Sequence, residues 1–239
     1  DAKTIWKFKN DLAETETVDK LFCMFDEHLE NKGLISHKGT IVDATFVDAP
    51  RQRNSRDENK KIKNGVIPEG WEKPENKSKL AQKDIDADWT KKNGERHFGY
   101  KDHVKCDADS KLITNYSVTS ASVHDSQRCL VFIGQEDEVL YADSAYSGKP
   151  IALALPENCK NQICEKGYRN SPLTSEQKMN NRRKSRIRCR IEQIFGFMTG
   201  AMHGITIRSI GITRAWMNIG ITNLVYNFCR YSYLKRASA

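Results

Sequence analysis

The chain has 239 residues, a formal net charge of +8 at pH 7 and 29% charged residues. This length is enough for one large or two small domains with a sizeable core. The charge favours a polyanionic partner, although a merely soluble basic protein has the same composition.

The seven cysteines are scattered along the sequence and argue against a structural zinc site. The two closest, Cys159 and Cys164, have four residues between them, and there is no C-x-x-C motif. An odd number of cysteines without a signal peptide predicts a reducing cytosol. No apolar run reaches the length that a membrane span requires.

The first part of the chain predicts helices and then a strand. Residues 2–32 have the spacing of two amphipathic helices with a break at residues 15–17. The sequence starts at Asp1, without an initiator Met, directly in a helix-like segment, so we expect an N-terminal portion to precede it. Residues 37–49, HKGTIVDATFVDA, are rich in β-branched side chains and predict the first strand.

Two acids lie inside this first strand, and only one of them is a good functional candidate. Asp43 and Asp48 are five positions apart, so strand alternation points them to opposite faces. Asp43 has apolar and β-branched neighbours in mid-strand, where a charge is costly without a partner or a metal. Asp48 lies close to Pro50 at the strand end, where an acid is easily solvated. We therefore take Asp43 as the candidate.

Residues 50–95 are polar and of mixed charge, and they include three of the six prolines. This composition predicts an insertion or a flexible loop rather than a core element. Its basic residues could contact DNA, but a solvated charge run is the simpler interpretation. Trp71 and Trp89 indicate that the segment docks somewhere on the protein.

A hairpin, a short helix and a buried strand follow. Residues 97–109 and 111–123 predict two strands that turn at residues 107–110. The next segment predicts a short helix with Ser122 or Asp125 near its N-cap, and capping alone explains Asp125. Residues 139–143, VLYAD, predict a central strand that is buried on both faces and closes on Asp143. Ligands of open α/β sheets bind at the carboxyl ends of strands, which makes Asp143 a second candidate.

Residues 180–203 predict a helix with two different faces. At about 100° per residue, Ile187, Ile191, Ile194 and Met198 form one stripe that faces the core. Six cations make the first half of this helix strongly basic: Arg182, Arg183, Lys184, Arg186, Arg188 and Arg190. Residues 204–211 predict a short strand, and residues 213–235 predict a last helix with one apolar face.

Glu192 stands alone on the basic helix. It is the only acid between Glu176 and the C-terminus, and it lies roughly 130° from the centre of the apolar stripe. A carboxylate in a cationic field is what a metal-dependent enzyme acting on a polyanion needs. The alternative is a weak surface pair between Glu192 and Arg188, one helical turn earlier. The helix alone leaves both interpretations open.

Asp43, Asp143 and Glu192 together form a candidate metal site. Two strand carboxylates and one helix carboxylate can hold two metal ions about 4 Å apart, as phosphodiester chemistry requires. Hard oxygen ligands suit Mg²⁺ or Mn²⁺ rather than zinc. The basic helix is then expected to supply phosphate contacts.

Several sequence blocks carry a resemblance to a known family: DAKTIWKFKNDL, GTIVDATFVDAPRQRN, WTKKNGERHFGYKDHV, TSASVHDSQ, YADSAYSG, RCRIEQIFGFM and ITNLVYNFCR. On these blocks, the chain resembles the DDE transposases of bacterial insertion sequences, of the insertion-sequence type five group. The resemblance implies an α/β fold with an RNase H-like core: a mixed five-stranded sheet flanked by helices, with a long polar insertion after the first strand. It also implies two divalent metals, and its three acids match Asp43, Asp143 and Glu192.

The helical signature of the family, Tyr-Arg-Glu-Lys, is only half present. Arg188 and Glu192 match it, but Ser185 stands where the Tyr is expected and Thr199 where the Lys is expected. This departure leaves the metal ligands intact and affects the contacts that orient the terminal nucleotides. The family also carries an upstream helical region, which this chain lacks.

We therefore expect a transposase that cleaves DNA at insertion-sequence ends and transfers the freed 3′-OH strand into target DNA, as a homodimer in the bacterial cytoplasm at the nucleoid. The expected segments are a helical region at 1–35, the catalytic core at 36–204 with its insertion at 50–95, and a strand and helix at 205–239. The alternatives are a nuclease of the same fold and a non-catalytic DNA-binding fragment. The candidate phosphate contacts are Arg182, Arg183, Arg188, Arg190 and Lys149.

Overall fold

The computed structural model describes residues 1–92 and 94–237. The two N-terminal helices are α1 (Ala2–Glu14) and α2 (Thr17–Asn31), with the break at the predicted place. The Asp1 side chain caps α1 by accepting from the Thr4 backbone N–H. Both helices contact the C-terminal helix α8 (Ile212–Ala237).

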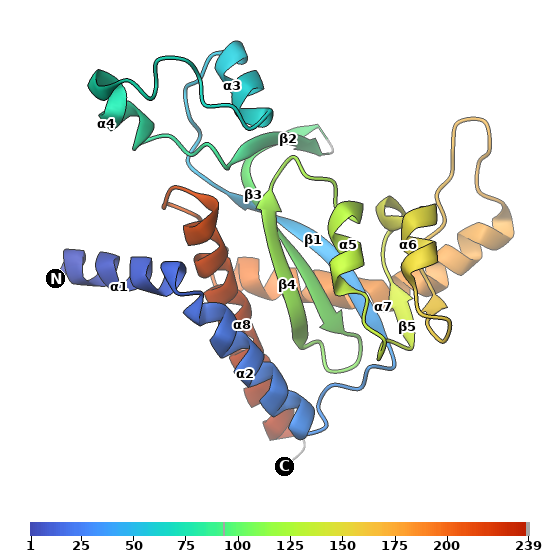
Figure 1. Cartoon of the computed structure of the whole chain (residues 1–239). Helices are drawn as coiled ribbons and strands as arrows, with labels where there is room; N and C mark the ends of the chain where they lie inside the picture. The colour runs from blue at the N-terminus through green and yellow to red at the C-terminus, as the bar shows by residue number, and fades with distance from the viewer. Residues whose placement is uncertain (93, 238–239) are drawn as a thin grey trace.

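A mixed sheet forms the centre of the molecule (Figure 1). Strand β1 is antiparallel to β3, which is antiparallel to β4; on its other side, β1 is parallel to β5, which is parallel to β6. The order β4-β3-β1-β5-β6 confirms the mixed five-stranded core and is that of the RNase H-like fold. The strands are β1 (Thr40–Asp48), β3 (Glu95–Asp107), β4 (Ile113–Ser120), β5 (Val139–Tyr141) and β6 (Lys160–Asn161).

Helices cover both faces of this sheet (Figure 1). One buried cluster joins β1, β3 and β4 to α7 and α8, and a second joins β1 and β5 to α5 and α6. Because β1 alternates, Ile41 packs in the first cluster and Val42 in the second. The covering helices are α5 (Ser126–Phe132), α6 (Lys149–Ala154) and α7 (Ser175–Gly200).

A buried amide fixes helix α8 against strand β4. The Asn227 side chain accepts from the Ile113 N–H at 2.9 Å and donates to the Ile113 carbonyl at 2.7 Å. One turn earlier, Asn223 donates to the buried carboxylate of Asp102 on β3. A Cβ on Gly220 would lie 2.3 Å from the Tyr116 hydroxyl, so glycine permits this close packing.

The polar segment after β1 is folded, so the expectation of a flexible loop is wrong for much of it. It contains α3 (Arg56–Lys63), a 3₁₀ turn (Pro74–Asn76) and α4 (Lys77–Leu80). Residues Asp88–Lys92 form β2, a sixth strand of the sheet, antiparallel to β3. The docking of the segment is confirmed for Trp89, which packs on Phe98, whereas Trp71 is buried and donates to Glu58 at 3.0 Å within the segment itself.

Two further expectations are wrong in detail. The predicted strand at residues 204–211 is a single bridge between Asp48 and Thr206, because the chain leaves the sheet edge at once. Asp125 stands at the N-cap position of α5 without capping it; its carboxylate accepts instead from the Lys101 ammonium at 2.7 Å. The division of the chain at residues 35 and 204 stays a prediction.

Candidate active site

Strands β1 and β5 place two acids next to each other. Their parallel register pairs Thr40 with Leu140 and Ile41 with Tyr141. Two residues further along are Asp43, still within β1, and Asp143, just beyond the end of β5. Ile41 and Tyr141 both pack on the side of helix α7. Strand alternation therefore directs the Asp43 carboxylate towards α7, and the charge of Asp143 also acts on Arg188 of that helix.

Helix α7 completes the site with Arg188 and Glu192. The Arg188 guanidinium lies 3.0 Å from Asp43 Oδ2 and 2.5 Å from Glu192 Oε1. It therefore joins a strand acid to a helix acid. The sequence interpretation of Arg188 and Glu192 as an isolated surface pair misses this third partner, because the contact to Asp43 spans 145 positions.

Asp43 lies in an environment that disfavours its charged form. Its side chain is 15% exposed, and Oδ1 accepts from the Ala44 N–H at 2.8 Å. Burial raises the pKa of Asp43 to about 6 and the charge of Asp143 adds to the rise, while the Ala44 N–H and Arg188 oppose it. For Arg188, burial lowers the pKa, but Asp43 and Glu192 outweigh burial and raise it overall. The guanidinium is therefore a permanent counter-charge.

Asp143 and Glu192 keep oxygen atoms for a ligand. Asp143 caps the 3₁₀ turn Ser144–Tyr146 by accepting from the Ala145 N–H at 2.6 Å through Oδ1. Glu192 is 54% exposed at the surface of α7. The site thus combines a buried acid, a capped acid and an exposed acid around one arginine.

Residues 35–228 match the model of the transposase DDE domain family. The chain belongs to this family. It is 30% identical, over 80% of its length, to the transposase for insertion sequence element IS1106 of Neisseria meningitidis serogroup B. The aligned part spans 64% of that relative. No solved structure matches the chain.

The three candidate acids fit the divalent metals that a transposase DDE domain implies. Their donors are carboxylate oxygens, which suit Mg²⁺ or Mn²⁺. Burial is the main cause of the raised pKa of Asp43, and the negative charge of Asp143 adds to it. A divalent cation relieves such repulsion, so the chemistry of the site favours one.

A second cluster of possible ligands lies elsewhere in this DDE domain and was not predicted. Among the described residues, the one group of three His, Cys, Asp or Glu side chains with ligand atoms within 4.8 Å of one another is His37, Glu136 and Asp137. His37 lies in the loop before β1, and the two acids precede β5. Proximity alone would make this group the metal site.

Protein donors already satisfy that cluster. The Lys105 ammonium lies 2.9 Å from Asp137 and 3.4 Å from Glu136. Asp137 also accepts from the Thr40 hydroxyl at 2.5 Å and from the Gly134 N–H at 2.8 Å. A buried carboxylate with a lysine and two hydrogen bonds is a structural ion pair, so we assign no metal to it.

The predicted phosphate contacts fall into two groups. Arg188 is engaged by the acids, and Arg190 donates to the Ala108 carbonyl at 2.6 Å and lies 3.1 Å from Asp109. The other three are exposed: Arg182, Arg183 and Lys149. A role in DNA binding stays a prediction for all five.

The first half of α7 is docked on the chain that follows β6. Lys184 donates to the Ile163 carbonyl at 2.9 Å, and the Asn181 side chain binds both backbone groups of Glu165. Ser185, at the position of the family Tyr, lies with its Oγ 3.9 Å from Cys164 Sγ. Thr199, at the position of the family Lys, donates to the Phe195 carbonyl of its own helix.

Sequence reasoning also missed Tyr146, which follows Asp143 in the block YADSAYSG. Its side chain is buried, and its hydroxyl has no hydrogen-bond partner among the described residues. Burial and the charge of Asp43 raise its pKa, so the hydroxyl keeps its proton.

Among the described residues, no helix has the length and apolarity that a bilayer crossing needs.

Proposed function

We propose that this chain is the catalytic core of an insertion-sequence transposase, which cleaves DNA at the ends of the element and joins the freed 3′-OH to target DNA. The observation that carries the proposal is the meeting of Asp43, Asp143 and Glu192, from three separate elements, around Arg188. Membership of the DDE family and the likeness to a transposase for an insertion sequence support the choice of substrate.

The three acids would hold two Mg²⁺ or Mn²⁺ ions. Asp43 would hold them together with Asp143, just beyond β5, and with Glu192 on α7. When bound, such ions activate the attacking oxygen and stabilise the leaving oxygen of a phosphodiester. The protein contributes fixed positions for these oxygens, since Asp43 is held by a central strand and Glu192 by a helix of 26 residues.

Arg188 has a second role in this proposal. Its guanidinium pairs with Asp43 and Glu192, and with divalent cations on these acids it would be released to bind the DNA. A planar guanidinium binds a phosphate through two parallel hydrogen bonds, so Arg188 is suited to orient the scissile group. Arg182, Arg183 and Lys149 are exposed and would contact the backbone further along. Both element ends are processed by a homodimer in this proposal.

The test is cleavage of labelled DNA that carries the element's ends, with Mg²⁺, with Mn²⁺ and with EDTA. We compare the chain with Glu192→Gln and with Glu176→Gln, a matched control in the first turn of the same helix. Metal-dependent cleavage should persist in Glu176→Gln and fall by about 10³-fold in Glu192→Gln, since a metal supplies several kcal/mol.

Joined products distinguish a transposase from a nuclease of the same fold. A strand-transfer assay with a 3′-OH donor should yield target DNA covalently attached to the donor end. Hydrolysis without joining would identify a nuclease instead. If Glu192→Gln cleaved as fast as the parent chain, the assignment of the site would be wrong.

A further inference from the structure

Two hollows lie on either side of the segment that leaves strand β1. The first, about 680 Å³, is bounded by residues 49–52, by residues 78–84 around the end of α4, and by the turn at 208–210. The second, about 460 Å³, lies between residues 52–59 and the β2–β3 pair. Gln52 lines both of them. We call this pair the insertion hollows.

The insertion hollows are lined by cations. Their one acid is Asp84, and its carboxylate is already used: it accepts from the Tyr100 hydroxyl at 2.7 and 2.8 Å and from the N–H groups of Asp86 and Ala87. The cations are Arg51, Lys79, Lys83 and Arg208 in the first hollow, and Lys91 and Arg96 in the second.

Four of these cations form no salt bridge with an acid among the described residues. Lys79 lies 3.5 Å from Glu58, and Lys83 donates to the Arg53 carbonyl and to Asn54. In contrast, the salt bridges among residues 1–92 and 94–237 include none of the other four, all of which are exposed: Arg51, Lys91, Arg96 and Arg208. Cations gathered in hollows whose one acid is already hydrogen-bonded repel one another and attract an anion.

An aromatic ring orients one of these cations, and a buried amide lies beside them. The Gln52 Oε1 atom is buried and has no hydrogen-bond partner among the described residues. An amide oxygen only accepts hydrogen bonds, so the partner it needs is a donor such as water, and it is the cations that favour a phosphate. The Arg51 guanidinium lies 5.8 Å from the centre of the Trp89 ring, which orients it.

The walls of the hollows are fixed to the core. The Tyr100 hydroxyl on β3 donates to Asp84, just after α4, at 2.7 and 2.8 Å, and inside the insertion the buried Trp71 donates to Glu58 on α3. The turn that carries Arg208 is tied to β1 by the Ile207 N–H, which donates to the Asp48 carbonyl at 3.1 Å. The cations therefore keep a constant distance from the acids on β1.

That distance can be expressed in base pairs. Asp48, at the end of β1, is five residues from Asp43, which is about 17 Å along a strand. One base pair of B-DNA advances about 3.4 Å. The hollows thus begin about five base pairs from Asp43, at the end of β1 where the inserted helices stand (Figure 1).

We propose that the insertion hollows bind the phosphate backbone of duplex DNA, about five base pairs from the phosphodiester held at Asp43. This inference rests on the proposed function and assigns a second contact surface to the same substrate. Phosphate contacts fix the register of a duplex without reading its sequence. The polar insertion is then a clamp that sets where along the DNA the acids act.

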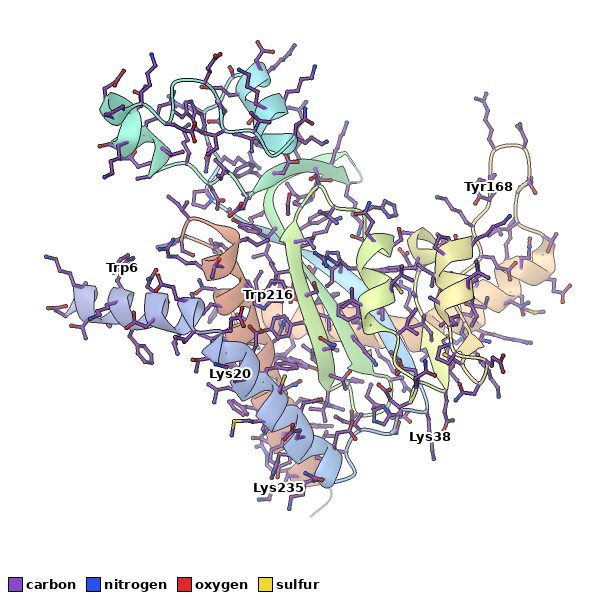
Figure 2. The ribbon with its side chains drawn as sticks, in the orientation of Figure 1. Trp6, Lys20, Lys38, Tyr168, Trp216 and Lys235 are labelled. Atoms are coloured by element: carbon purple, nitrogen blue, oxygen red, sulfur yellow. The ribbon has the colours of Figure 1, made fainter. Side chains whose placement is uncertain are left out.

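The test measures DNA affinity against salt concentration by fluorescence anisotropy. The variant is Arg51→Gln/Arg208→Gln, and the matched control is Lys38→Gln/Lys235→Gln, with the same change of charge. Lys38 and Lys235 lie at the opposite end of the molecule from the inserted helices (Figure 2). Each protein is tested on a duplex that extends well past the hollows and on one that stops about three base pairs from the cleaved bond.

On the long duplex, the arginine variant should bind at least about 10-fold more weakly than the control. The slope of log K against log salt should fall by about 1.8, because each phosphate contact contributes about 0.9. On the short duplex, both proteins should bind alike. Lys91→Gln/Arg96→Gln repeats the test on the second hollow, and thermal unfolding checks that each variant is folded.

Equal affinity and equal salt slope for the variants and the control on the long duplex would overturn the inference and leave the proposed function standing. A weaker affinity on both duplexes alike would also overturn it, since the contact would not depend on distance. Failure of the parent chain to bind either duplex would instead overturn the proposed function, and the inference with it.

Discussion

Two carboxylate clusters flank the same strand, and they differ in how their oxygen atoms are used. At Asp137, which is 2% exposed, Lys105, Thr40 and Gly134 supply donors from the protein itself. Around Asp43, the acids share one arginine, and Glu192 remains 54% exposed. The cluster with the shorter distances between its ligand atoms is therefore the one whose oxygen atoms already have protein partners.

This difference shows that short distances between acids do not by themselves identify a metal site. The His37 group has ligand atoms within 4.8 Å of one another, but an ammonium ion and hydrogen bonds occupy them. The acids around Arg188 share one guanidinium, and Asp143 and Glu192 each use one oxygen atom in the hydrogen bonds of the described residues and keep the other. Accessible oxygen atoms, rather than mutual proximity, mark the site that can take a cation.

The largest expected effect separates the clusters by activity. Asp143→Asn keeps an oxygen that can cap the Ser144–Tyr146 turn, but it removes a proposed metal ligand. We expect DNA cleavage to fall by about 10³-fold while the thermal unfolding midpoint is unchanged, because a metal contributes several kcal/mol to the transition state. Glu136→Gln, which removes one charge from the exposed side of the other cluster, is the matched control. Cleavage that survived in Asp143→Asn would place catalysis elsewhere.

The next effect concerns stability. Lys105→Met leaves Asp137 buried without its cation, which should lower the free energy of unfolding by about 3–5 kcal/mol in urea titrations. Adding Asp137→Asn should restore part of this loss, because an amide needs no counter-charge. A change below about 1 kcal/mol would contradict the structural assignment of this cluster.

A third buried acid, Asp102, sharpens the comparison because none of the salt bridges among the described residues involves it. Burial raises its pKa to about 8, although a hydrogen bond from Asn223 opposes the shift. Between about pH 4 and pH 8, the unfolded chain releases this proton and the folded chain keeps it, so the free energy of unfolding falls as pH rises.

Asp102→Asn removes this titration and supplies an N–H group to the Asn223 oxygen, which has no partner among the described residues. We expect the variant to gain about 4 kcal/mol over the parent chain at pH 7 relative to pH 4, since each of the three pH units contributes about 1.4 kcal/mol. Urea titrations at the two pH values measure it. The same difference at both pH values would mean that Asp102 is ionised in the folded protein.

The smallest effect tests the edge of the satisfied cluster. Glu136 is 51% exposed and lies 3.4 Å from Lys105, so Glu136→Gln should change the free energy of unfolding by less than about 1 kcal/mol. The shift of the unfolding midpoint with added Mn²⁺ should be the same as in the parent chain. A smaller Mn²⁺ shift in Glu136→Gln would show that this cluster does bind metal.

The sequence predicts the acids of the site better than it predicts their partners. Strand alternation separates Asp43 from Asp48, and the prediction that Asp143 closes the VLYAD strand is confirmed by its place just beyond β5. These rules are local. The contact between Arg188 and Asp43 joins positions 145 apart, and no local pattern contains it.

The polar segment after β1 shows the same limit. Its composition predicts a loop, because few of its side chains are apolar. One buried tryptophan with a partner at Glu58, together with a strand paired to β3, orders it nonetheless. Likewise Asp125 meets Lys101 across 24 positions, which the N-cap rule does not consider. Contacts with residues distant in the sequence determine the structure of the segment and the role of Asp125. Rules that consider only neighbouring residues do not include such contacts.

The pair of hydrogen bonds between Asn227 and Ile113 has a consequence for how α8 can assemble. A helix held only by apolar contacts can shift along a sheet, since apolar contacts in neighbouring registers have similar energies. Shifting α8 by one turn, about 5.4 Å, would leave a buried N–H and a buried carbonyl without hydrogen-bond partners, which costs about 1–3 kcal/mol for each group. Asn227 therefore fixes the register of α8 on the sheet. Because α1 and α2 contact α8, their positions depend on the same register.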